Sequence, residues 1–181
     1  FQTLTSLNAS DKNGHGTHVS GTAAGVAGTA ITIGTTSVTL SGVAPKAFLG
    51  NYNVFPGCFT LKCIITLDGG AFDHDIVAAV EAAVADGMDV LNLSLGGRAH
   101  PKDALSNAVN AAVDAGLVVA VAAGNSGPGR GTVESPGTAS KVITVGATTN
   151  PHFEGIPVTV SGTTYGAALG EFANFDPAIT K

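Results

Sequence analysis

The strongest hydrophobic pattern in the chain is a continuous apolar run from Leu117 to Ala123. Seven apolar residues followed at once by the turn sequence Gly124-Asn125-Ser126-Gly127 predict a strand buried on both faces, as in a parallel sheet covered by helices. The turn places the amide of Asn125 at the carboxyl end of this strand, which is the edge where open α/β sheets bind ligands. Taken alone, the position fits a turn-shaping role for Asn125 equally well.

Apolar residues at helical or strand spacing predict the neighbouring elements. Further strands are expected over 47–54, 89–95 and 142–146, and helices over 15–27, 73–86 and 101–115. The second helix should take its cap from Asp73 or Asp75, and the third should begin at Pro101. Gly87 and Gly116 are expected to end these two helices. The alternation of strands and helices predicts consecutive right-handed crossovers in a parallel sheet.

Two segments and one helix depart from this alternation. Residues 29–39 are expected to form a turn or hairpin, and residues 156–167 a hairpin around Ser161-Gly162. The helix over 15–27 contains Gly16, Gly21 and Gly25. Because glycine costs roughly 1 kcal/mol relative to alanine at a helical site, these glycines predict a close approach of that helix to another backbone.

Composition restricts the class of protein without identifying it. With 181 residues, 44% of them hydrophobic and 12% charged, the chain is long enough for one domain with a sizeable core. Its net charge of −5 provides no basic surface for nucleic acid, so nucleic acid is not an expected partner. No apolar run approaches the roughly 20 residues that span a bilayer. The first residues, from Phe1 to Ser6, do not resemble a signal peptide, and we interpret the chain as a part of a longer protein.

The two cysteines, Cys58 and Cys63, lie five positions apart in a polar loop sequence. This spacing allows a short-loop disulfide, which would place the protein in an oxidising compartment, or two unpaired thiols. A zinc site is less favoured, because the sequence has no second cysteine pair and no histidine close by.

His15 opens the helix predicted over 15–27 and is a candidate general base. The positive end of a helix dipole favours a neutral imidazole, the form that accepts a proton. His18 follows one turn later, but no carboxylate or third ligand accompanies the pair at metal-binding spacing, so we predict no metal site. A capping or packing role is the alternative for His15.

Three stretches in this order resemble subtilisin-like serine proteases, the subtilases. Asn13-Gly14-His15-Gly16-Thr17-His18-Val19-Ser20-Gly21-Thr22 is similar to their histidine motif, Val90–Gly96 to their substrate-binding strand, and Ala122–Gly127 to their oxyanion-hole segment. The segments from Ser135 to Ala139 and from Val142 to Ala147 also follow the usual sequence of the family. The resemblance covers roughly Asp11 to Thr149. It implies a three-layer subtilisin-like α/β fold, with a mostly parallel central sheet, helices on both faces and an antiparallel hairpin tail.

The same resemblance assigns roles to individual residues. It implies that His15 is the catalytic general base and Asn125 the oxyanion donor, with His18 a structural residue of its motif. The two sides of a substrate cleft would be formed by Ser94, Leu95 and Gly96 and by Ala122, Ala123 and Gly124. It further implies polypeptide substrates, a secreted or extracellular location, and no required cofactor. Calcium is common in the family, but no ligand set can be matched here.

Two of the three triad segments of the family are not recognisable in the chain. The aspartate belongs to a strand well before the histidine, yet only 14 residues precede His15, and Asp11 lies in the histidine loop itself. The serine belongs to a Gly-Thr-Ser-Met-Ala segment, to which Gly162-Thr163-Thr164 has only a faint likeness. We therefore interpret residues 1–150 as a partial catalytic domain and residues 151–181 as a tail leading towards an inserted domain. On this interpretation the chain is inactive alone, and the rest of the parent chain completes the active site.

Two other classes of function compete with a serine endopeptidase. A non-catalytic subtilase-like binding or scaffolding module would keep the fold without the chemistry, and substituted aspartate and serine motifs in the parent would favour it. A nucleotide-binding α/β domain is excluded by sequence, because there is neither a Gly-x-Gly-x-x-Gly after a strand nor a phosphate loop with lysine.

Overall fold

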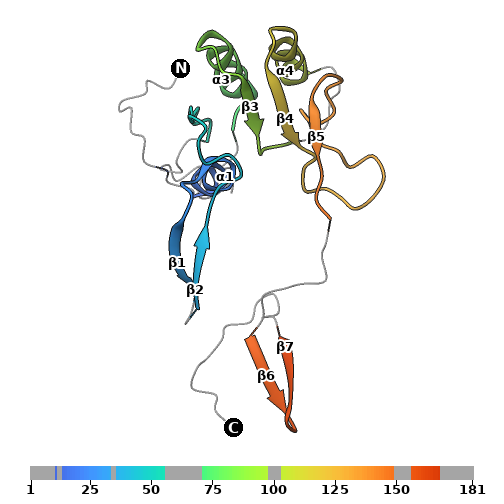
Figure 1. The fold of residues 1–181 in the computed structure, drawn as a ribbon. Coiled ribbons are helices and arrows are strands. Elements are labelled where there is room, and N and C mark those ends of the chain that lie inside the picture. Colours follow the sequence, from blue (N-terminus) through green and yellow to red (C-terminus); the bar gives the residue numbers. More distant parts are fainter. Residues whose placement is uncertain are drawn as a thin grey trace, which may run out of the picture. The chain divides into compact units, whose positions relative to one another are not determined.

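A computed structural model describes residues 11, 14–33, 36–55, 71–97, 103–148 and 156–167 (Figure 1). The contacts within the chain divide it into two units, Phe1–Gly146 and Ala147–Lys181, and each is described by itself. In chain order the elements are α1 (His15–Ala24), β1 (Thr29–Ile33), β2 (Thr36–Leu40), α3 (Asp73–Ala85), β3 (Val90–Leu93), α4 (Ala104–Asp114), β4 (Val118–Ala122), β5 (Ile143–Val145), β6 (Ile156–Val160) and β7 (Thr163–Ala167).

The central sheet of the first unit is parallel, with the strand order β3-β4-β5. Val90 lies opposite Val118 in one ladder, and Ala120 lies opposite Ile143 in the other. The apolar run at Leu117 therefore forms the middle strand, and β3-α4-β4 is a parallel crossover unit. The predicted α/β fold and the parallel order of these strands are confirmed.

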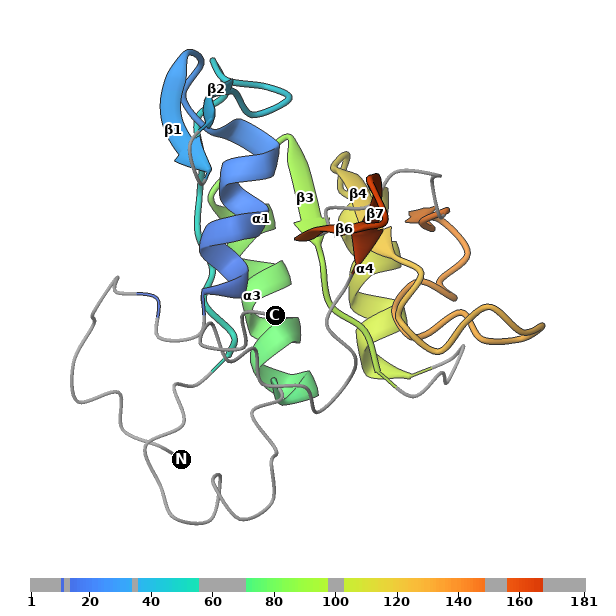
Figure 2. The same cartoon turned by 90° about the horizontal axis from the view of Figure 1, so that it is seen from below.

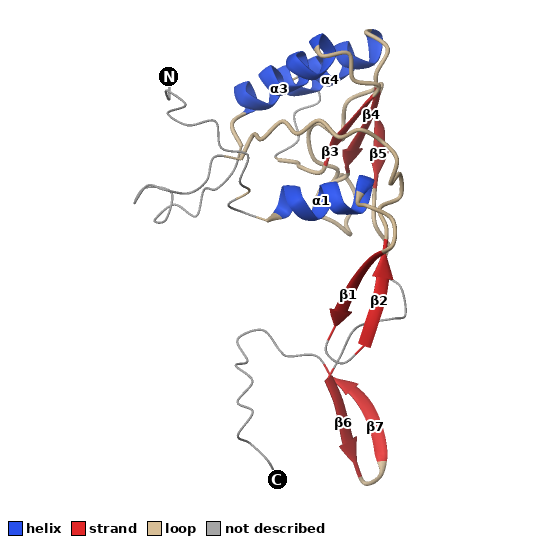
Figure 3. Ribbon diagram, turned by 60° about the vertical axis from the view of Figure 1, so that its left-hand side comes forward, coloured by secondary structure: helices blue, strands red, loops and turns tan. Residues whose placement is uncertain are grey.

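The core lies between one face of this sheet and the helices α3 and α4. Figure 3 shows both helices on the same side of the sheet. Most of the buried apolar side chains come from helix positions three or four apart and from alternate positions of β4, and Leu117 and Ala139 lie just outside these elements. The cluster comprises Ile76, Val80, Leu93, Leu105, Val109, Ala112, Leu117, Val119, Val121 and Ala139. Each fully buried valine or leucine contributes about 1.5–3 kcal/mol of hydrophobic free energy.

The expectation that the Leu117 run is buried on both faces is wrong for the structure described here. Val119 and Val121 are 1% exposed, but Val118, on the other face of the same strand, is 50% exposed. Val90 and Ile143, from the neighbouring strands, are also exposed. Helix α1 lies on that side of the sheet (Figure 3), but a cavity separates it from β3. An apolar run indicates that both faces of a strand could be buried. Whether both are buried depends on the elements that pack against it, which the run itself does not determine.

The strand predicted over 47–54 does not form, although the segment is close to β3. Residues 48–55 form one wall of a cavity of about 490 Å³, and residues 90–95 form another. A strand needs a hydrogen-bonded partner on at least one edge, and the cavity separates this segment from β3. Side chains hold it instead, since the Tyr52 hydroxyl donates to the Asp86 carboxylate over 2.6 Å. Phe48 and Leu49 are exposed.

Helices α3 and α4 both end at the glycines predicted to stop them. In α3, the Met88 N–H bonds to Ala83 O and the Gly87 N–H bonds to Val84 O, each at 3.1 Å. This pair of bonds is a Schellman motif, and the φ of +73° at Gly87 is the left-handed conformation that the motif requires. Gly116 has φ +105° after α4.

The starts of these helices differ from prediction. Asp73 and Asp75 lie in the first turn of α3, and the cap position is Phe72, which makes no side-chain cap bond. Helix α4 begins at Ala104, not Pro101, because the carboxylate of Asp103 accepts from the Ser106 N–H over 2.6 Å. Carboxylates in the first turn still complement the helix dipole, which explains why Asp73 and Asp75 are favourable without capping.

Helix α1 is followed by the β1-β2 hairpin, as predicted (Figure 2). The predicted close approach at its glycines is wrong for Gly16 and Gly21, where an added Cβ would have no contact nearer than 3.9 Å. The close approach occurs just beyond the helix. A Cβ on buried Gly42 would collide with backbone atoms of Ala24 and Gly25, because the Gly42 N–H bonds to Gly25 O.

The second unit contains the antiparallel hairpin β6-β7 that the sequence predicts around Ser161-Gly162. Both turn residues have positive φ, 51° and 82°, as in a type I′ turn. Among the described residues of the whole chain, no helix is long and apolar enough to cross a bilayer.

Candidate active site

The start of α1 and the carboxyl ends of β3 and β4 open onto one cavity of about 570 Å³. His15, Ser94, Leu95, Gly96 and Asn125 line it. The structure therefore brings the predicted base, the predicted oxyanion donor and one predicted substrate segment to the same place. Ala122, Ala123 and Gly124 are not among its lining residues.

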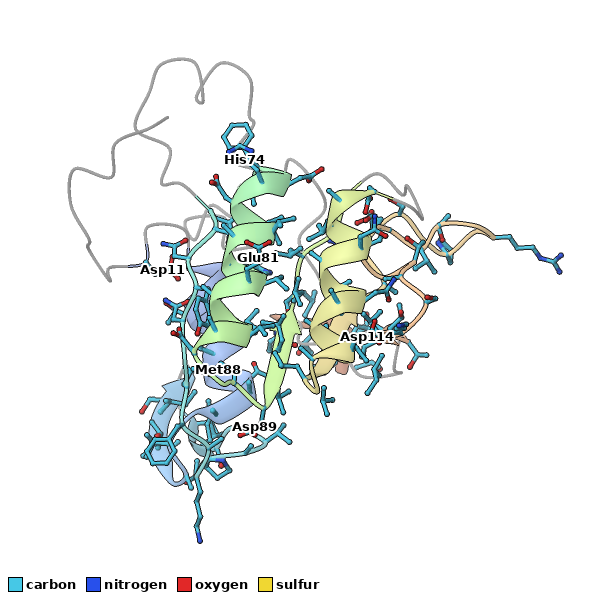
Figure 4. All side chains as sticks on the ribbon, turned by 90° about the horizontal axis from the view of Figure 1, so that it is seen from above. Asp11, His74, Glu81, Met88, Asp89 and Asp114 are labelled. Atoms are coloured by element: carbon cyan, nitrogen blue, oxygen red, sulfur yellow. The ribbon has the colours of Figure 1, made fainter. Side chains whose placement is uncertain are left out.

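His15 is the first residue of α1, and its helix is held at this end by Asp11. The Asp11 carboxylate accepts from the Gly14 N–H over 2.8 Å and from the Thr17 N–H and hydroxyl over 2.9 and 2.7 Å. These bonds satisfy amides that the first turn of a helix leaves unpaired, so Asp11 acts as the cap that Gly14 cannot be. Figure 4 labels Asp11. Sequence reasoning assigned Asp11 no role, although aspartate is a common capping residue near a helix start.

The imidazole of His15 is exposed and contacts an aromatic ring. Its ring lies edge-on to Phe55, with centroids 6.2 Å apart and an interplanar angle of 69°. Phe55 also lines the cavity. The contact restricts how the imidazole can turn while leaving it open to a ligand. His18 is exposed one turn along α1, and its backbone N–H bonds to Gly14 O over 3.0 Å.

The segment that follows β3 is held by an antiparallel bridge rather than by β4. Gly97 and Ser135 exchange two backbone hydrogen bonds, each of 3.0 Å. The buried Ser135 hydroxyl donates to Asp103 over 2.6 Å. Asp103 therefore caps α4 and anchors the cavity wall through the same carboxylate.

Asn125 follows a glycine that redirects the chain after β4. Gly124 has φ +92°, which is strained for residues with a side chain. The Asn125 N–H donates to Glu134 Oε1 over 3.4 Å, and the Ser126 hydroxyl donates to the same oxygen. Asn125 itself is exposed. Glu134 thus supports the turn that carries the predicted oxyanion donor, and nothing in the local sequence pattern indicated this contact.

The second predicted substrate segment, Ala122–Gly124, is tied to its neighbours by backbone bonds. The Ala123 N–H donates to Val145 O over 2.8 Å, and Ala123 O accepts from the Glu134 N–H over 2.9 Å. In the described part of the chain, no three histidine, cysteine or acidic side chains gather as a metal-binding group. Cys58 and Cys63 lie outside the described residues.

Comparison with known proteins connects this geometry to one family. The family model described as "Subtilase family" matches residues 3–179. Minor extracellular protease Vpr of Bacillus subtilis (strain 168) is 41% identical over 139 residues, which cover 76% of this chain and 14% of that protein. Subtilisin-like protease SBT5.4 of Arabidopsis thaliana is 43% identical over 141 residues, covering 76% of this chain and 17% of that protein. The chain thus spans less than a fifth of the length of these two relatives.

Solved structures give the same result for the fold. A structure titled "S41 Psychrophilic Protease" has a TM-score of 0.51 and 31% identity, over 70% of this chain and 37% of its own. Sphericase has a TM-score of 0.50 and 33% identity, over 71% and 37% respectively.

Proposed function

This chain belongs to the subtilase family, and we propose on that basis that it supplies the general base and the oxyanion donor of a serine endopeptidase. The observation that carries the proposal is the shared cavity. His15 and Asn125, which are far apart in sequence, line it together with Ser94–Gly96. A general base and a polar donor beside an extended segment are the parts that peptide-bond hydrolysis requires.

In the proposed reaction, the His15 imidazole removes the proton from a serine hydroxyl as its oxygen attacks the peptide carbonyl. The imidazolium then protonates the leaving amine, which leaves an acyl-enzyme that a water molecule hydrolyses with His15 again as base. The cap at Asp11 serves this step by fixing the first turn of α1, where His15 lies. Positioning of this kind lowers the entropic cost of bringing base and nucleophile together.

Asn125 has the complementary role at the carbonyl oxygen. Its side-chain amide would donate to the negative charge that develops on this oxygen in the tetrahedral intermediate. In subtilisin, a member of this family, removal of the equivalent donor raises the barrier by about 2.7–4 kcal/mol. The Glu134 contacts to Asn125 and Ser126 support the turn that holds the amide.

The substrate is a polypeptide that binds as an extended strand between Ser94–Gly96 and Ala122–Gly124. The triad aspartate and serine come from parts of the protein other than residues 1–181, so these residues alone are inactive. We place the protein outside the cell, because the relative Vpr is named as an extracellular protease. There a Cys58–Cys63 disulfide would be stable.

The test compares the intact protein, its His15→Ala variant and the 181-residue chain on unstructured casein. We expect turnover by the intact protein that a serine-directed phosphonate abolishes, and none from the other two. Phosphonate-sensitive turnover by the 181-residue chain comparable to the intact protein would show that the nucleophile lies within these residues. An inert intact protein, unchanged by His15→Ala, would establish a binding module instead.

A further inference from the structure

Glu134 lies between the two segments that we propose to flank the substrate. Its N–H donates to Ala123 O over 2.9 Å, which ties it to the end of β4. The next residue, Ser135, is bridged to Gly97 after β3. The backbone of Glu134 is therefore held on both sides, and its side chain projects from a fixed point between the two segments.

The Glu134 side chain occupies the space that Gly96 and Gly124 leave empty. A Cβ on Gly96 would come within 2.7 Å of Glu134 Oε2 and 3.2 Å of Glu134 Cβ. A Cβ on Gly124 would collide with the same carboxyl group. Because neither glycine has a side chain, the carboxylate fits between Gly96 and Gly124 and contacts both segments.

The position of Glu134 relative to Asn125 selects one residue of the substrate. Oε1 accepts from the backbone N–H of Asn125 over 3.4 Å, so the carboxylate lies beside the residue whose side-chain amide is the proposed oxyanion donor. That donor binds the carbonyl oxygen of the residue that precedes the scissile bond. To reach Glu134, the side chain of this same residue would extend past Gly96, which lines the cavity, towards Gly124.

The charge of this group lacks an ionic partner within the described residues. Salt bridges there join His74 to Asp75 and Lys141 to Asp114, and neither includes Glu134. Oε1 accepts from Ser126 and Asn125, whereas Oε2 faces Gly96 and Gly124. A half-buried carboxylate with one oxygen directed at two glycines favours a cationic ligand, because charge-assisted hydrogen bonds are stronger than neutral ones.

We propose that Glu134 makes this protein select substrates with lysine or arginine immediately before the scissile bond. The proposal rests on the peptidase function proposed above and names its substrate class. An ammonium or guanidinium group on that residue would bind Glu134 Oε2 between the two glycines. A neutral side chain would leave the carboxylate without a partner, and an acidic one would be repelled.

The experiment uses the intact protein and a series of peptides that differ only at this residue, with Lys, Arg, Gln, Leu or Glu. We expect kcat/KM for Lys and Arg to exceed that for Gln by about 10- to 100-fold, the range of a hydrogen bond to a charged group. Glu134→Gln keeps the size of the side chain and an acceptor for Ser126, and should abolish this preference. Glu81→Gln, on the exposed outer side of α3 (Figure 4), is the matched control and should retain it. The preference should also weaken as salt is added.

Three results would overturn the proposal. Equal loss of kcat/KM for every peptide in Glu134→Gln would show that Glu134 only supports the turn at Asn125. A wild-type protein that cleaves the series without regard to charge would refute the selectivity and leave the peptidase function intact. Failure of the intact protein to cleave either the series or casein would refute both.

Discussion

Asp103 is the side chain on which we expect the wall of the cavity to depend most. Oδ1 accepts from the Ser106 N–H and Oδ2 from the Ser135 hydroxyl, both over 2.6 Å, and both serines are buried. Asp103→Ala removes a helix cap, which costs about 0.5–2 kcal/mol. It also removes the acceptor of the buried Ser135 hydroxyl, and a buried polar group without a hydrogen-bond partner costs about 1–3 kcal/mol. Ser106 Oγ remains 3.3 Å from Ser135 Oγ, so we expect a total near the middle, about 2–4 kcal/mol.

Urea unfolding followed by circular dichroism measures this loss. Asp103→Asn retains an acceptor for the Ser106 N–H and should cost about 1 kcal/mol. Asp114→Ala is the control, because Asp114 forms an exposed ion pair with Lys141, worth about 0–1 kcal/mol. If the unfolding free energies of Asp103→Ala and Asp114→Ala differ by less than about 0.5 kcal/mol, the dual role that we assign to Asp103 is wrong.

Three further predictions follow from other features. Asn125→Ala should lower kcat of the intact protein about 10²- to 10³-fold, the range known from subtilisin, with KM for a chromogenic peptide little changed; a change in KM alone would contradict an oxyanion role. Gly21→Ala should stabilise α1 by about 0.5–1 kcal/mol, because its added Cβ meets open space. Gly42→Ala should destabilise the fold by about 1–3 kcal/mol, because its Cβ collides with the backbone. The two substitutions should therefore shift the thermal unfolding midpoint in opposite directions. The hydrogen bond to Asp86 raises the pKa of Tyr52 above 10.0, and burial and the charge of Asp86 raise it further. The protonated hydroxyl therefore stabilises the fold below pH 10, and this contribution is lost as pH rises through the raised pKa. Tyr52→Phe should make the free energy of unfolding fall less steeply above pH 10.

The elements that depend on local sequence could be predicted. Helix α4 has its apolar residues three and four positions apart, and it ends at Gly116 because a left-handed residue is needed there. The β6-β7 turn likewise follows from two adjacent turn residues, Ser161 and Gly162, of which Gly162 adopts its positive φ without strain. In both cases the physical cause lies within a few residues of the effect.

The features that depend on distant partners could not be predicted. Residues 47–54 have the composition of a strand, but the cavity beside β3 leaves them without a hydrogen-bonded partner. The run at Leu117 is apolar on both faces, yet among the described residues the core beneath α3 and α4 buries Val119 and Val121, and Val118 on the other face is 50% exposed. Whether a segment with strand-like composition pairs with another strand, or becomes buried, depends on which elements lie beside it in the fold.

The candidate site divides in the same way. His15 and Asn125 were found because each belongs to a short motif, and the structure brings both to one cavity. Glu134 was missed because its importance comes from Gly96 and Gly124, which approach it only in the folded chain. Asp11 acts within six residues along the chain and was open to prediction from sequence.

The parallel sheet with α3 and α4 on one face also has a kinetic consequence. Its packing joins elements that are neighbours along the chain, since α3 contacts α4, β3 pairs with β4, and β4 pairs with β5. Each strand pairing nevertheless closes a long crossover connection, as between Val90 and Val118, and parallel sheets form slowly because this closure entropy is lost before the pairing is gained. We expect the amides of β4, which has partners on both edges, to gain protection from hydrogen exchange earliest during refolding. The cavity at the ends of β3 and β4 would then take shape on a framework that has already formed.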